Sequence, residues 1–531
     1  MSRTAEALLP LPLHDLAATV SRSFEADRQF LSSWGRLPAL RSLTPPWRPE
    51  RHGDPRRGEN CFQGLAHSLA GLDDWDDSSL PELWRYHLHY FDVPAAGVIT
   101  QGLESWAAWL AARLRSHWAC WRPGRGVAWK PYPVAVRLQN LLRIWSVLHA
   151  EGGGATRPDL DAELARHTRT ATLQLAWRLE HHLEGNHLLR ELCALALGAR
   201  AWGMERLFAR SMRRLVQQVE LQFGENGGHE ERSPRYHLDL LRDLVELRLA
   251  LGEESPGSLD GVIAAGLDFA EALEHPDGDI PLFNDCELDA GPSRATLSAC
   301  VGHRPQAWTG LRVFEDEGFV VARLGLGHLV FDCGPLAADH QPAHSHCDIL
   351  SFEYSWGGSR LVGNRGTAAY GQGPERRASR STAWHSTVQI GQGEQAELWR
   401  GFRLGWRGRP VLEGARMDLG RVELVGSFRW HPSVGAEHRR FLQLDESGVL
   451  RVEDRVNFSG AVSPVTARFY LPGAEDGRRP KVNLAAEGAE IHDSEAPWFP
   501  RLGVSQPGRL ARLQAPLGTS VGFVTTITPD R

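Results

Sequence analysis

The hydrophobic pattern of this 531-residue chain changes its period near residue 311. Before that point, apolar residues recur at helical spacing, as at Leu138, Leu141, Trp145 and Leu148. Beyond it, short apolar runs alternate with glycine-containing turns, a pattern typical of antiparallel strands. Because helices and strands bury their apolar faces with different periods, we expect two successive parts, a helical one and then a β-sheet one.

The first part is expected to consist of paired helices. The same spacing marks two more of them, through Leu188, Leu192, Leu195 and Ala199 and through Leu238, Leu241, Val245 and Leu249. Ser233 followed by Pro234 supplies an N-cap and a first helical residue, and Asn186 is expected to cap a helix that begins at His187. Amphipathic helices separated by short polar breaks favour antiparallel pairs stacked in a solenoid or a toroid.

The second part is expected to form an antiparallel β-sandwich. Residues 325–327 and 445–448 each separate two short apolar runs, so each predicts the turn of a hairpin. Short strands with glycine punctuation continue toward the C-terminus. The predicted fold class is therefore α+β and multidomain, with a helical domain over residues 1–305, an antiparallel β-sandwich over residues 306–531, and the junction within residues 291–312.

Composition restricts the class of protein. Hydrophobic residues make up 42% of the chain and charged residues 23%, and a net charge of −6 offers no basic footprint for nucleic acid. No apolar run approaches the roughly 18 residues of a membrane-spanning helix, so membrane insertion is not expected. The seven cysteines contain no C-x-x-C pair, and the N-terminus shows no signal-peptide core. We expect a cytoplasmic protein, with the periplasm as the second choice.

Polar residues concentrate between His344 and His385, among short apolar runs that predict strands. His344 and His346 are two residues apart, so on an extended segment their side chains point to the same face. A metal ion would suit His346 and His385 together with an amide oxygen from Asn364. The alternative is a set of hydrogen-bonded histidines in the core of the sandwich.

Two further polar clusters lie at predicted helix starts. Asn186 and His187 form the first, where backbone N–H groups and the helix dipole favour an anion such as a carboxylate. The alternative is a capping asparagine beside a surface histidine. The second cluster, residues 226–237, is a glycine-rich loop that runs into a helix with Tyr236 in its first turn. Its alternative is a loop with ordinary capping and ion pairs.

Taken together and in this order, the clusters resemble the heparinase II/III-like family of polysaccharide lyases, which includes the oligoalginate lyases. The matching segments are residues 83–92, 129–133, 185–189, 227–237, 344–352, 366–367 and 380–388. They span roughly residues 80 to 460. The resemblance implies an (α/α) toroid of helical hairpins followed by an antiparallel β-sandwich. It also implies β-elimination at a 4-linked uronic acid.

The chemistry that the resemblance implies assigns roles to four residues. The C5 proton of a uronic acid is poorly acidic while the neighbouring carboxylate is charged, so the site must neutralise that carboxylate. By motif, Asn186 would neutralise it, together with His187. Tyr236 would protonate the leaving O4 and, depending on the epimer bound, act as the base too. His344 or His187 would serve as the base or as a carboxylate partner.

A zinc site is implied by the same resemblance. His346 and His385 match the family's zinc ligands, but Asn364 stands where the family has an aspartate. A neutral amide lacks the charge attraction of a carboxylate for Zn²⁺, so a hydrogen-bonded cluster of the same shape is the alternative. Substrate binding is assigned to other polar residues of the matched segments: His229, Glu230, Arg232, Tyr132 and Arg380.

Three functions remain open from the sequence. The first is a lyase acting on an anionic, uronate-containing oligo- or polysaccharide. The second is a glycoside hydrolase on the same toroid, which would need two carboxylates such as Glu230, Glu231 or Asp348 to face each other across a cleft. The third is a non-catalytic glycan-binding or exopolysaccharide-assembly protein. The identity of the sugar, endo or exo action and the oligomeric state are not predicted.

Overall fold

The computed structural model describes residues 25–44, 48–69, 71, 74–75, 77–121, 123–124, 126–473 and 482–530. Its contacts divide the chain into two compact units. The helical unit comprises Met1–Gln222, Asp239–Ala264 and Arg294–His303, and the sheet unit comprises Phe223–Leu238, Ala265–Ser293 and Arg304–Arg531. The domain boundary predicted between residues 305 and 306 remains a prediction, since the units interleave along the sequence.

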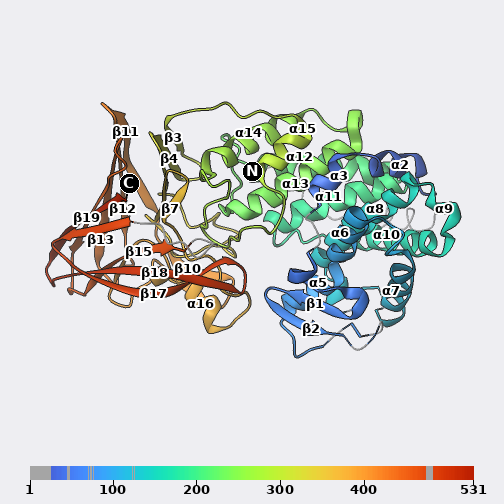
Figure 1. The fold of residues 1–531 in the computed structure, drawn as a ribbon, viewed down its shortest axis with the longest axis horizontal. Coiled ribbons are helices and arrows are strands. Elements are labelled where there is room, and N and C mark those ends of the chain that lie inside the picture. The colour runs from blue at the N-terminus through green and yellow to red at the C-terminus, as the bar shows by residue number, and fades with distance from the viewer. Residues whose placement is uncertain are drawn as a thin grey trace. The chain divides into compact units, whose positions relative to one another are not determined.

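The helices carry the labels of Figure 1. The α-helices are α2 (Arg28–Gly35), α3 (Ala39–Leu43), α4 (Pro49–His52), α5 (Glu82–Tyr90), α6 (Asp92–Gln101), α7 (Ala107–Cys120), α8 (Pro131–Ala150), α9 (Gly153–Thr156), α10 (Pro158–Arg178), α11 (Gly185–Ala201), α12 (Glu205–Gln222), α13 (Pro234–Leu251), α14 (Ser258–Leu273), α15 (Arg294–Val301) and α16 (Pro374–Arg380). Short 3₁₀ turns are η1 (Pro55–Arg57), η2 (Val127–Trp129), η3 (Gly252–Glu254) and η4 (Thr382–Trp384).

The strands begin with a small hairpin, β1 (Glu59–Phe62) and β2 (Leu65–Ser68), and the others belong to the sheet unit. These are β3 (Gly310–Phe314), β4 (Phe319–Leu324), β5 (Gly327–Asp332), β6 (Phe352–Trp356), β7 (Ser359–Val362), β8 (Val388–Ile390), β9 (Ala396–Trp399), β10 (Arg403–Arg407), β11 (Pro410–Asp418), β12 (Arg421–Arg429), β13 (Ala436–Asp445), β14 (Leu450–Phe458), β15 (Val465–Pro472), β16 (Val482–Glu487), β17 (Glu490–Arg501), β18 (Val504–Ala515) and β19 (Ser520–Pro529).

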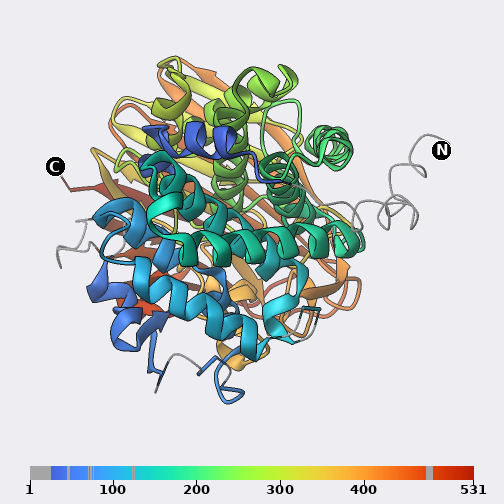
Figure 2. The same ribbon diagram turned by 90° about the vertical axis from the view of Figure 1, so that its right-hand side faces the viewer.

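Helix α8 lies at the centre of the packing in the helical unit. Leu138, Leu141, Leu142 and Leu148 are completely buried, and a helix that is apolar on most sides is stable only when neighbours surround it. Helices α2, α10 and α11 pack against α8, and α7 packs against α10, as Figure 2 shows for these blue to teal helices. The three helices expected from leucine spacing are therefore confirmed as α8, α11 and α13.

Buried ion pairs join α13 to two of its neighbours within the helical unit. The Arg143 guanidinium of α8 donates to both carboxylate oxygens of Glu246. Arg190 of α11 donates to Asp243 across 2.6 Å. Removing one partner of such a pair would leave an uncompensated buried charge, so these contacts fix how the helices align. In the part of the chain that the structure describes, no helix is long and apolar enough to span a bilayer.

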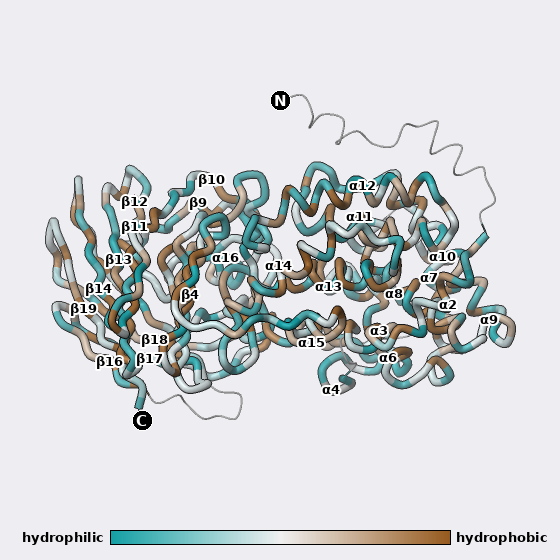
Figure 3. Tube along the Cα trace, turned by 90° about the horizontal axis from the view of Figure 1, so that it is seen from above, coloured by the Kyte–Doolittle hydropathy of each residue, from teal (hydrophilic) through white to brown (hydrophobic). Residues whose placement is uncertain are grey.

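Three larger antiparallel sheets build the sheet unit. Their strand orders are β3-β4-β5-β6-β7, β11-β12-β13-β14-β19-β16 and β17-β18-β15-β8. One core joins them, with Phe331, Phe352, Leu424, Leu442 and Phe469 among its completely or almost completely buried members. Side chains alternate between core and solvent along β13 and β14. Figure 3 shows teal and brown segments in succession along the strands of this unit. The two predicted hairpins are confirmed as β4–β5 and β13–β14.

Two segments from the helical part of the sequence belong to the sheet unit, residues 223–238 and 265–293. The end of α14 packs on the first sheet, where the Phe269 ring lies edge-on to Phe314 with centroids 5.0 Å apart. His237 Nε2 lies 2.9 Å from the carbonyl oxygen of Gly266, which ties the start of α13 to α14. These contacts position the first turn of α13 within the sheet unit.

Candidate active site

Tyr236 occupies the first turn of α13. The helix begins at Pro234, and the Ser233 hydroxyl accepts a hydrogen bond from the Tyr236 backbone N–H, so the predicted cap is confirmed. The half-buried Tyr236 ring packs on the His344 ring with centroids 4.0 Å apart. Its hydroxyl lies 3.1 Å from the Tyr370 hydroxyl. A phenol, an imidazole and a second phenol therefore lie together in the sheet unit.

The segment that carries His344 and His346 is a loop, and the prediction of a strand there is wrong. The chain returns to a strand only at β6, and the Ser345 and Pro342 carbonyls accept hydrogen bonds from the buried Arg380 guanidinium. These side-chain bonds replace the ladder that a strand would have made. The two histidines nevertheless converge, because both reach the carboxylate of Asp285.

Asp285 lies at the centre of this cluster and contacts three of its side chains. Its carboxylate lies 2.9 Å from His344 Nδ1 and 2.8 Å from His346 Nε2, and it accepts both guanidinium N–H groups of Arg376. Burial alone would raise the pKa of Asp285, but the Arg376 charge and the two histidine bonds hold that pKa well below its usual value. The carboxylate is therefore ionised and accepts only.

An ionised Asp285 fixes the tautomer of His344. Since the carboxylate can only accept, Nδ1 of His344 carries the proton, and Nε2 of the neutral ring keeps its lone pair. That Nε2 lies 3.6 Å from a carboxylate oxygen of Glu231. The His344 side chain is about a tenth exposed. This arrangement suits a general base.

Tyr370 and Arg376 complete the cluster around Tyr236. Burial raises the pKa of Tyr370 well above its usual value, with the Asp285 charge adding to the effect. Tyr370 therefore stays a phenol and can donate a hydrogen bond to the Tyr236 oxygen. The Arg376 guanidinium lies over the Tyr370 ring, 4.8 Å from its centroid. This contact orients the ring that faces Tyr236.

Sequence reasoning missed Asp285, Tyr370 and Arg376. Asp285 directly follows a short apolar run and Asn284, a signal too common in loops to single it out. Arg376 precedes the matched segment at residues 380–388 by only a few positions. The hydrogen bond between Arg376 and Asp285 joins residues 91 positions apart. Such a pairing is created by the fold and leaves no local spacing to find.

Arg380, predicted to bind substrate, is almost completely buried. Burial lowers the pKa of its guanidinium to about 10, with the Arg376 charge contributing. Its Nε donates to the Ser345 carbonyl across 2.8 Å. The structure therefore shows Arg380 bracing the loop that presents His344, and a direct contact with substrate stays a prediction.

The three residues predicted from the glycine-rich loop differ in exposure. His229 is 2% exposed, and its ring packs edge-on against Phe223. Arg232 is also buried, with a positive φ of 57°, and donates to the carboxylate of Asp332. Glu230 lies 3.3 Å from His340 Nε2 in a partly exposed pair. His229 and Arg232 hold the loop together, and substrate contact by any of the three stays a prediction.

The residues predicted to bind zinc lie close together in the sheet unit. The rings of His346 and His385 have centroids 5.2 Å apart, and Asn364 Oδ1 lies 3.1 Å from His385 Nδ1. Burial lowers the pKa of His346 to about 4 and that of His385 well below its usual value, so both rings are neutral. Each neutral ring carries one proton.

The two rings have fewer matched hydrogen-bond partners than their nitrogens require, which favours a metal ion at the cluster. His346 donates through Nε2 to Asp285, which leaves its buried Nδ1 without a hydrogen-bond partner. The two ring nitrogens of His385 each face an oxygen that can only accept: Nε2 faces the Ser379 carbonyl and Nδ1 faces Asn364 Oδ1. The neutral ring has one proton, so it can donate to only one of them. A cation among these atoms would resolve both mismatches, and Asp285 and Ser379 would orient the rings from outside. The two imidazoles and the amide fit Zn²⁺ without adding charge, and zinc itself stays a prediction.

Asn186 and His187 lie in the helical unit, at the start of α11. The helix begins at Gly185, after Glu184 with a positive φ of 53°, and Asn186 is inside its first turn, so the predicted cap is wrong. His187 is partly exposed and lies against Tyr132, with ring centroids 4.3 Å apart. The Tyr132 hydroxyl in turn accepts a hydrogen bond from Arg190 across 2.6 Å.

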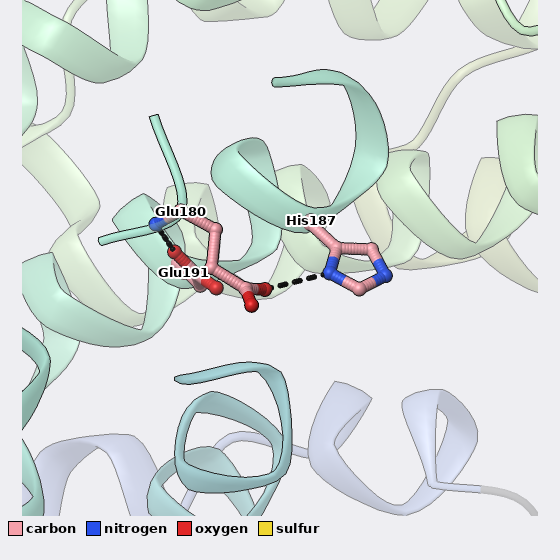
Figure 4. Close-up of side chains that lie close together, drawn as sticks. All are labelled: Glu180, His187 and Glu191. Atoms are coloured by element: carbon pink, nitrogen blue, oxygen red, sulfur yellow. Dashed lines mark hydrogen bonds and ion pairs between the residues drawn. The ribbon is translucent and has the colours of Figure 1, made fainter. Parts of the chain in front are cut away.

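Two glutamates lie behind His187. Its Nδ1 lies 2.7 Å from a Glu180 oxygen, and the Glu180 backbone N–H donates to Glu191 across 2.8 Å, as Figure 4 shows. Burial raises the pKa of Glu191 well above its usual value, and the Glu180 charge raises it further. Burial opposes ionisation of Glu180 as well, but the His187 hydrogen bond and charge leave the Glu180 pKa lowered. The ionised member of the pair is therefore Glu180.

Each unit thus assembles part of the predicted site. The sheet unit brings Tyr236, His344 and His346 together around Asp285, and the helical unit places His187 against Tyr132 beside Asn186. The prediction that both groups face one bound sugar remains a prediction. The predicted hydrolase carboxylates Glu230 and Glu231 are adjacent in sequence and both belong to the sheet unit.

A family model matches much of the second half of the chain. Residues 308–510 match the family model described as Heparinase II/III-like, C-terminal. In sequence, the chain is 26% identical over 468 residues to FtsZ-localized protein C of Caulobacter vibrioides, a match that covers 82% of this chain and 78% of that protein.

Solved structures share the fold along nearly the whole chain. The crystal structure of heparinase III matches with a TM-score of 0.73 and 13% identity, over 97% of this chain and 88% of that one. The heparan sulfate lyase HepC from Pedobacter heparinus matches with a TM-score of 0.57 and 14% identity, over 96% and 84%. The Streptomyces coelicolor chondroitin AC lyase, in complex with chondroitin sulphate, matches with a TM-score of 0.54 and 12% identity, over 97% and 81%.

At these identities the structural likeness establishes the fold. The predicted class, an N-terminal (α/α) toroid followed by an antiparallel β-sandwich, is confirmed. The resemblance stated from the motifs is confirmed with it: residues 308–510 match the model of the heparinase II/III-like C-terminal domain, and the chain has the fold of heparinase III.

Proposed function

We propose that the protein is a lyase that cleaves a 4-linked, uronate-containing polysaccharide or oligosaccharide by β-elimination. The observation that carries this proposal is the Tyr236–His344 pair, with ring centroids 4.0 Å apart and His344 Nδ1 held by Asp285. It joins one group suited to donate a proton with one suited to accept a proton. The fold shared with heparinase III and with chondroitin AC lyase supports the same reaction class.

In the proposed reaction, a base removes the C5 proton, electrons form the C4–C5 double bond, and the C4–O4 bond breaks. His344 Nε2 is the candidate base, because Asp285 keeps the proton on Nδ1. Tyr236 protonates the departing O4 and, depending on the epimer, acts as the base too. A hydrogen bond from Tyr370 would stabilise the Tyr236 phenolate that results.

The sugar carboxylate must lose its effective charge before C5 becomes acidic. Asn186 and His187 are proposed to form hydrogen bonds to it, from the first turn of α11, where unsatisfied backbone N–H groups favour an anion. The partial exposure of His187 supports a role at the substrate. Tyr132 would hold the His187 ring in place through the ring contact already described.

A metal ion bound by His346, Asn364 and His385 would act on the shape of the site. It would join the loop of His344 and His346 to the segments around Asn364 and His385. Bound there, it would supply a fixed positive charge near Asp285. The unmatched hydrogen-bonding atoms of the His346 and His385 rings support binding of an ion there. No step of the proposed reaction passes through the ion.

A non-catalytic role is the second candidate. The curated relative is named for its localisation with FtsZ, and Asn364 departs from the family's zinc ligand. Under this alternative the chain would bind a uronate-containing glycan without cleaving it, as part of a larger assembly.

The proposal is tested by incubating the protein with uronate polymers, including alginate, heparan sulfate and hyaluronan. A lyase creates an unsaturated uronate that absorbs ultraviolet light, whereas a hydrolase does not. The variant Tyr236→Phe should lose nearly all turnover, because the leaving oxygen then lacks its proton donor. Tyr86→Phe is the matched control, since the Tyr86 hydroxyl bonds the exposed side chains of Glu82 and Lys130. Full turnover by Tyr236→Phe would contradict the proposed role, and binding without turnover across the panel would favour the second candidate.

A further inference from the structure

A second candidate metal site lies in the helical unit, apart from the three residues that match the family's zinc ligands. Glu180, His187 and Glu191 each offer one ligand atom, and these atoms lie within 4.8 Å of one another. Figure 4 shows the Glu180 carboxylate between His187 and Glu191. The two outer residues are four positions apart on α11, so both side chains lie on the same side of the helix.

The surroundings of this cluster disfavour two negative charges at once. Glu191 is completely buried, and the Glu180 side chain is 16% exposed. Within the described ranges of the chain, no lysine or arginine forms an ion pair with either glutamate, whereas Glu180 pairs with His187. Two carboxyl groups this close, one of them buried, favour either a shared proton or a cation between them.

An oxygen of Glu191 shows where a cation would bind. Glu191 Oε2 accepts the backbone N–H of Glu180, while Oε1 is buried and accepts no hydrogen bond. Without an ion, a protonated Glu191 bonds to the Glu180 carboxylate. A buried oxygen without a donor loses its hydration and gains nothing in return, at a cost of about 1–3 kcal/mol for a neutral group and more for a charged one. A metal ion supplies the missing interaction at that atom.

Zinc binding requires the side chains to adjust, since their ligand atoms lie within 4.8 Å of one another. Ligand atoms about 2.0–2.2 Å from a tetrahedral Zn²⁺ lie about 3.3 Å from one another. His187 Nδ1 and the Glu180 oxygen are 2.7 Å apart, so the imidazole would move outward by a few tenths of an ångström. The partly exposed side chain of His187 has room to move toward solvent, and the same opening gives an ion its route in.

We propose that Glu180, His187 and Glu191 bind a divalent transition-metal ion of the Zn²⁺ type. One imidazole and two carboxylates form a ligand set that Zn²⁺ accepts, and three protein ligands leave the fourth tetrahedral position open. The net charge of this set with Zn²⁺ is zero. The second set, at His346, Asn364 and His385, is neutral without the ion, so the acidic set should bind more tightly.

Metal binding at Nδ1 changes what His187 can do. A ring bound through Nδ1 keeps its proton on Nε2, so His187 becomes a hydrogen-bond donor and not a base. It would then act as a partner of the sugar carboxylate, and the open position of the ion could bind the carboxylate as well. This consequence depends on the proposed lyase function, whereas ion binding itself does not.

The test measures zinc binding by the full-length protein after metal has been removed with a chelator. Competition with a chromophoric chelator gives both affinity and stoichiometry. Glu191→Gln and His187→Gln should each abolish one equivalent or weaken it by at least about 10–100-fold, the loss that even indirect contacts to a metal site cause. Glu205→Gln, an exposed glutamate at the start of α12, is the matched control and should bind normally.

The variant His385→Ala separates the two sites. It should keep the equivalent of bound zinc that Glu191→Gln loses. Added Zn²⁺ should raise the midpoint of thermal unfolding of the wild-type protein, and it should raise that of His187→Gln less. Far-ultraviolet circular dichroism establishes that each variant is folded. Unchanged zinc binding in Glu191→Gln and His187→Gln, or binding that only His385→Ala removes, would overturn the proposal. So would a wild-type protein that takes up no zinc, since the glutamates would then share a proton. None of these outcomes depends on lyase activity.

Discussion

Replacing Asp285 with asparagine tests the central charge of the sheet unit. The substitution keeps the shape of the side chain but removes the negative charge that faces Arg376, His344 and His346. Arg376 is itself completely buried, so its guanidinium would be left as an uncompensated charge. Breaking a buried pair in this way costs about 3–5 kcal/mol. For units of this size, each kcal/mol of lost stability lowers the midpoint of thermal unfolding by about 2–4 °C. Asp285→Asn should therefore lower this midpoint by about 6–20 °C.

The assay is thermal unfolding at pH 7, followed by tryptophan fluorescence. The pKa of Asp285 is lowered in the folded state, so its stabilisation is complete above the unfolded pKa near 3.9 and disappears as the pH falls through the lower folded value. The difference between wild type and variant should therefore shrink in acid. Asp339→Asn is the control, because Asp339 also pairs with two arginines but is 66% exposed. Such exposed pairs contribute about 0–1 kcal/mol. Equal effects of the two substitutions would refute the reasoning.

Three further predictions concern a hydrogen bond, a buried histidine and a glycine. Tyr370→Phe removes a donor to the Tyr236 oxygen and should raise the pKa of Tyr236 by about one unit, measured by ultraviolet titration against Tyr236→Phe. Burial lowers the pKa of His237 to about 4, below the unfolded value of about 6.5. The stability contributed by the neutral ring is therefore complete above pH 6.5, and up to about 3 kcal/mol of it is lost between pH 6.5 and 4. In urea unfolding, His237→Gln should flatten this pH dependence. Gly366→Ala should destabilise the protein by about 2–4 kcal/mol, because a Cβ at its φ of +74° would lie 1.9 Å from a carbonyl oxygen of β17.

Each of these predictions has a result that would contradict it. For Tyr370, an unchanged Tyr236 pKa would show that the hydroxyl contact carries no energy. For His237, an unaltered slope between pH 6.5 and 4 in the variant would assign the acid sensitivity to other groups. For Gly366, the control is Gly371→Ala, where φ is +102° and nothing lies within 4 Å of the new Cβ. Similar losses at both glycines would mean that backbone strain, and not the close contact, sets the cost.

Several features of the fold and the site could be predicted from local sequence. Leucines at helical spacing predicted α8, α11 and α13, and short apolar runs around glycine turns predicted the hairpins β4–β5 and β13–β14. Ser233 followed by Pro234 located the start of α13 and so placed Tyr236 in its first turn. These features depend on periodicity and capping, which neighbouring residues express within a few positions.

Other features were decided only when distant segments met. The loop of His344 takes its shape from Arg380 and Asp285, which occupy the hydrogen bonds that a strand would have used. Helix α11 begins at Gly185, two residues before the predicted start at His187, because the positive φ of Glu184 turns the chain there. Sequence spacing predicts neither, because both depend on where the backbone is held by other parts of the fold.

The sequence alone determined which parts of this protein are helical and which are sheet, and which side chains could take part in chemistry. Tertiary structure decided their electrostatic state. Asp285 is ionised because Arg376, 91 residues away, lies against it, and Glu180 and Glu191 differ in charge because one reaches His187 while the other is completely buried. Hydrophobic period is a property of neighbours along the chain, whereas pKa and tautomer depend on the charges and burial that folding brings about.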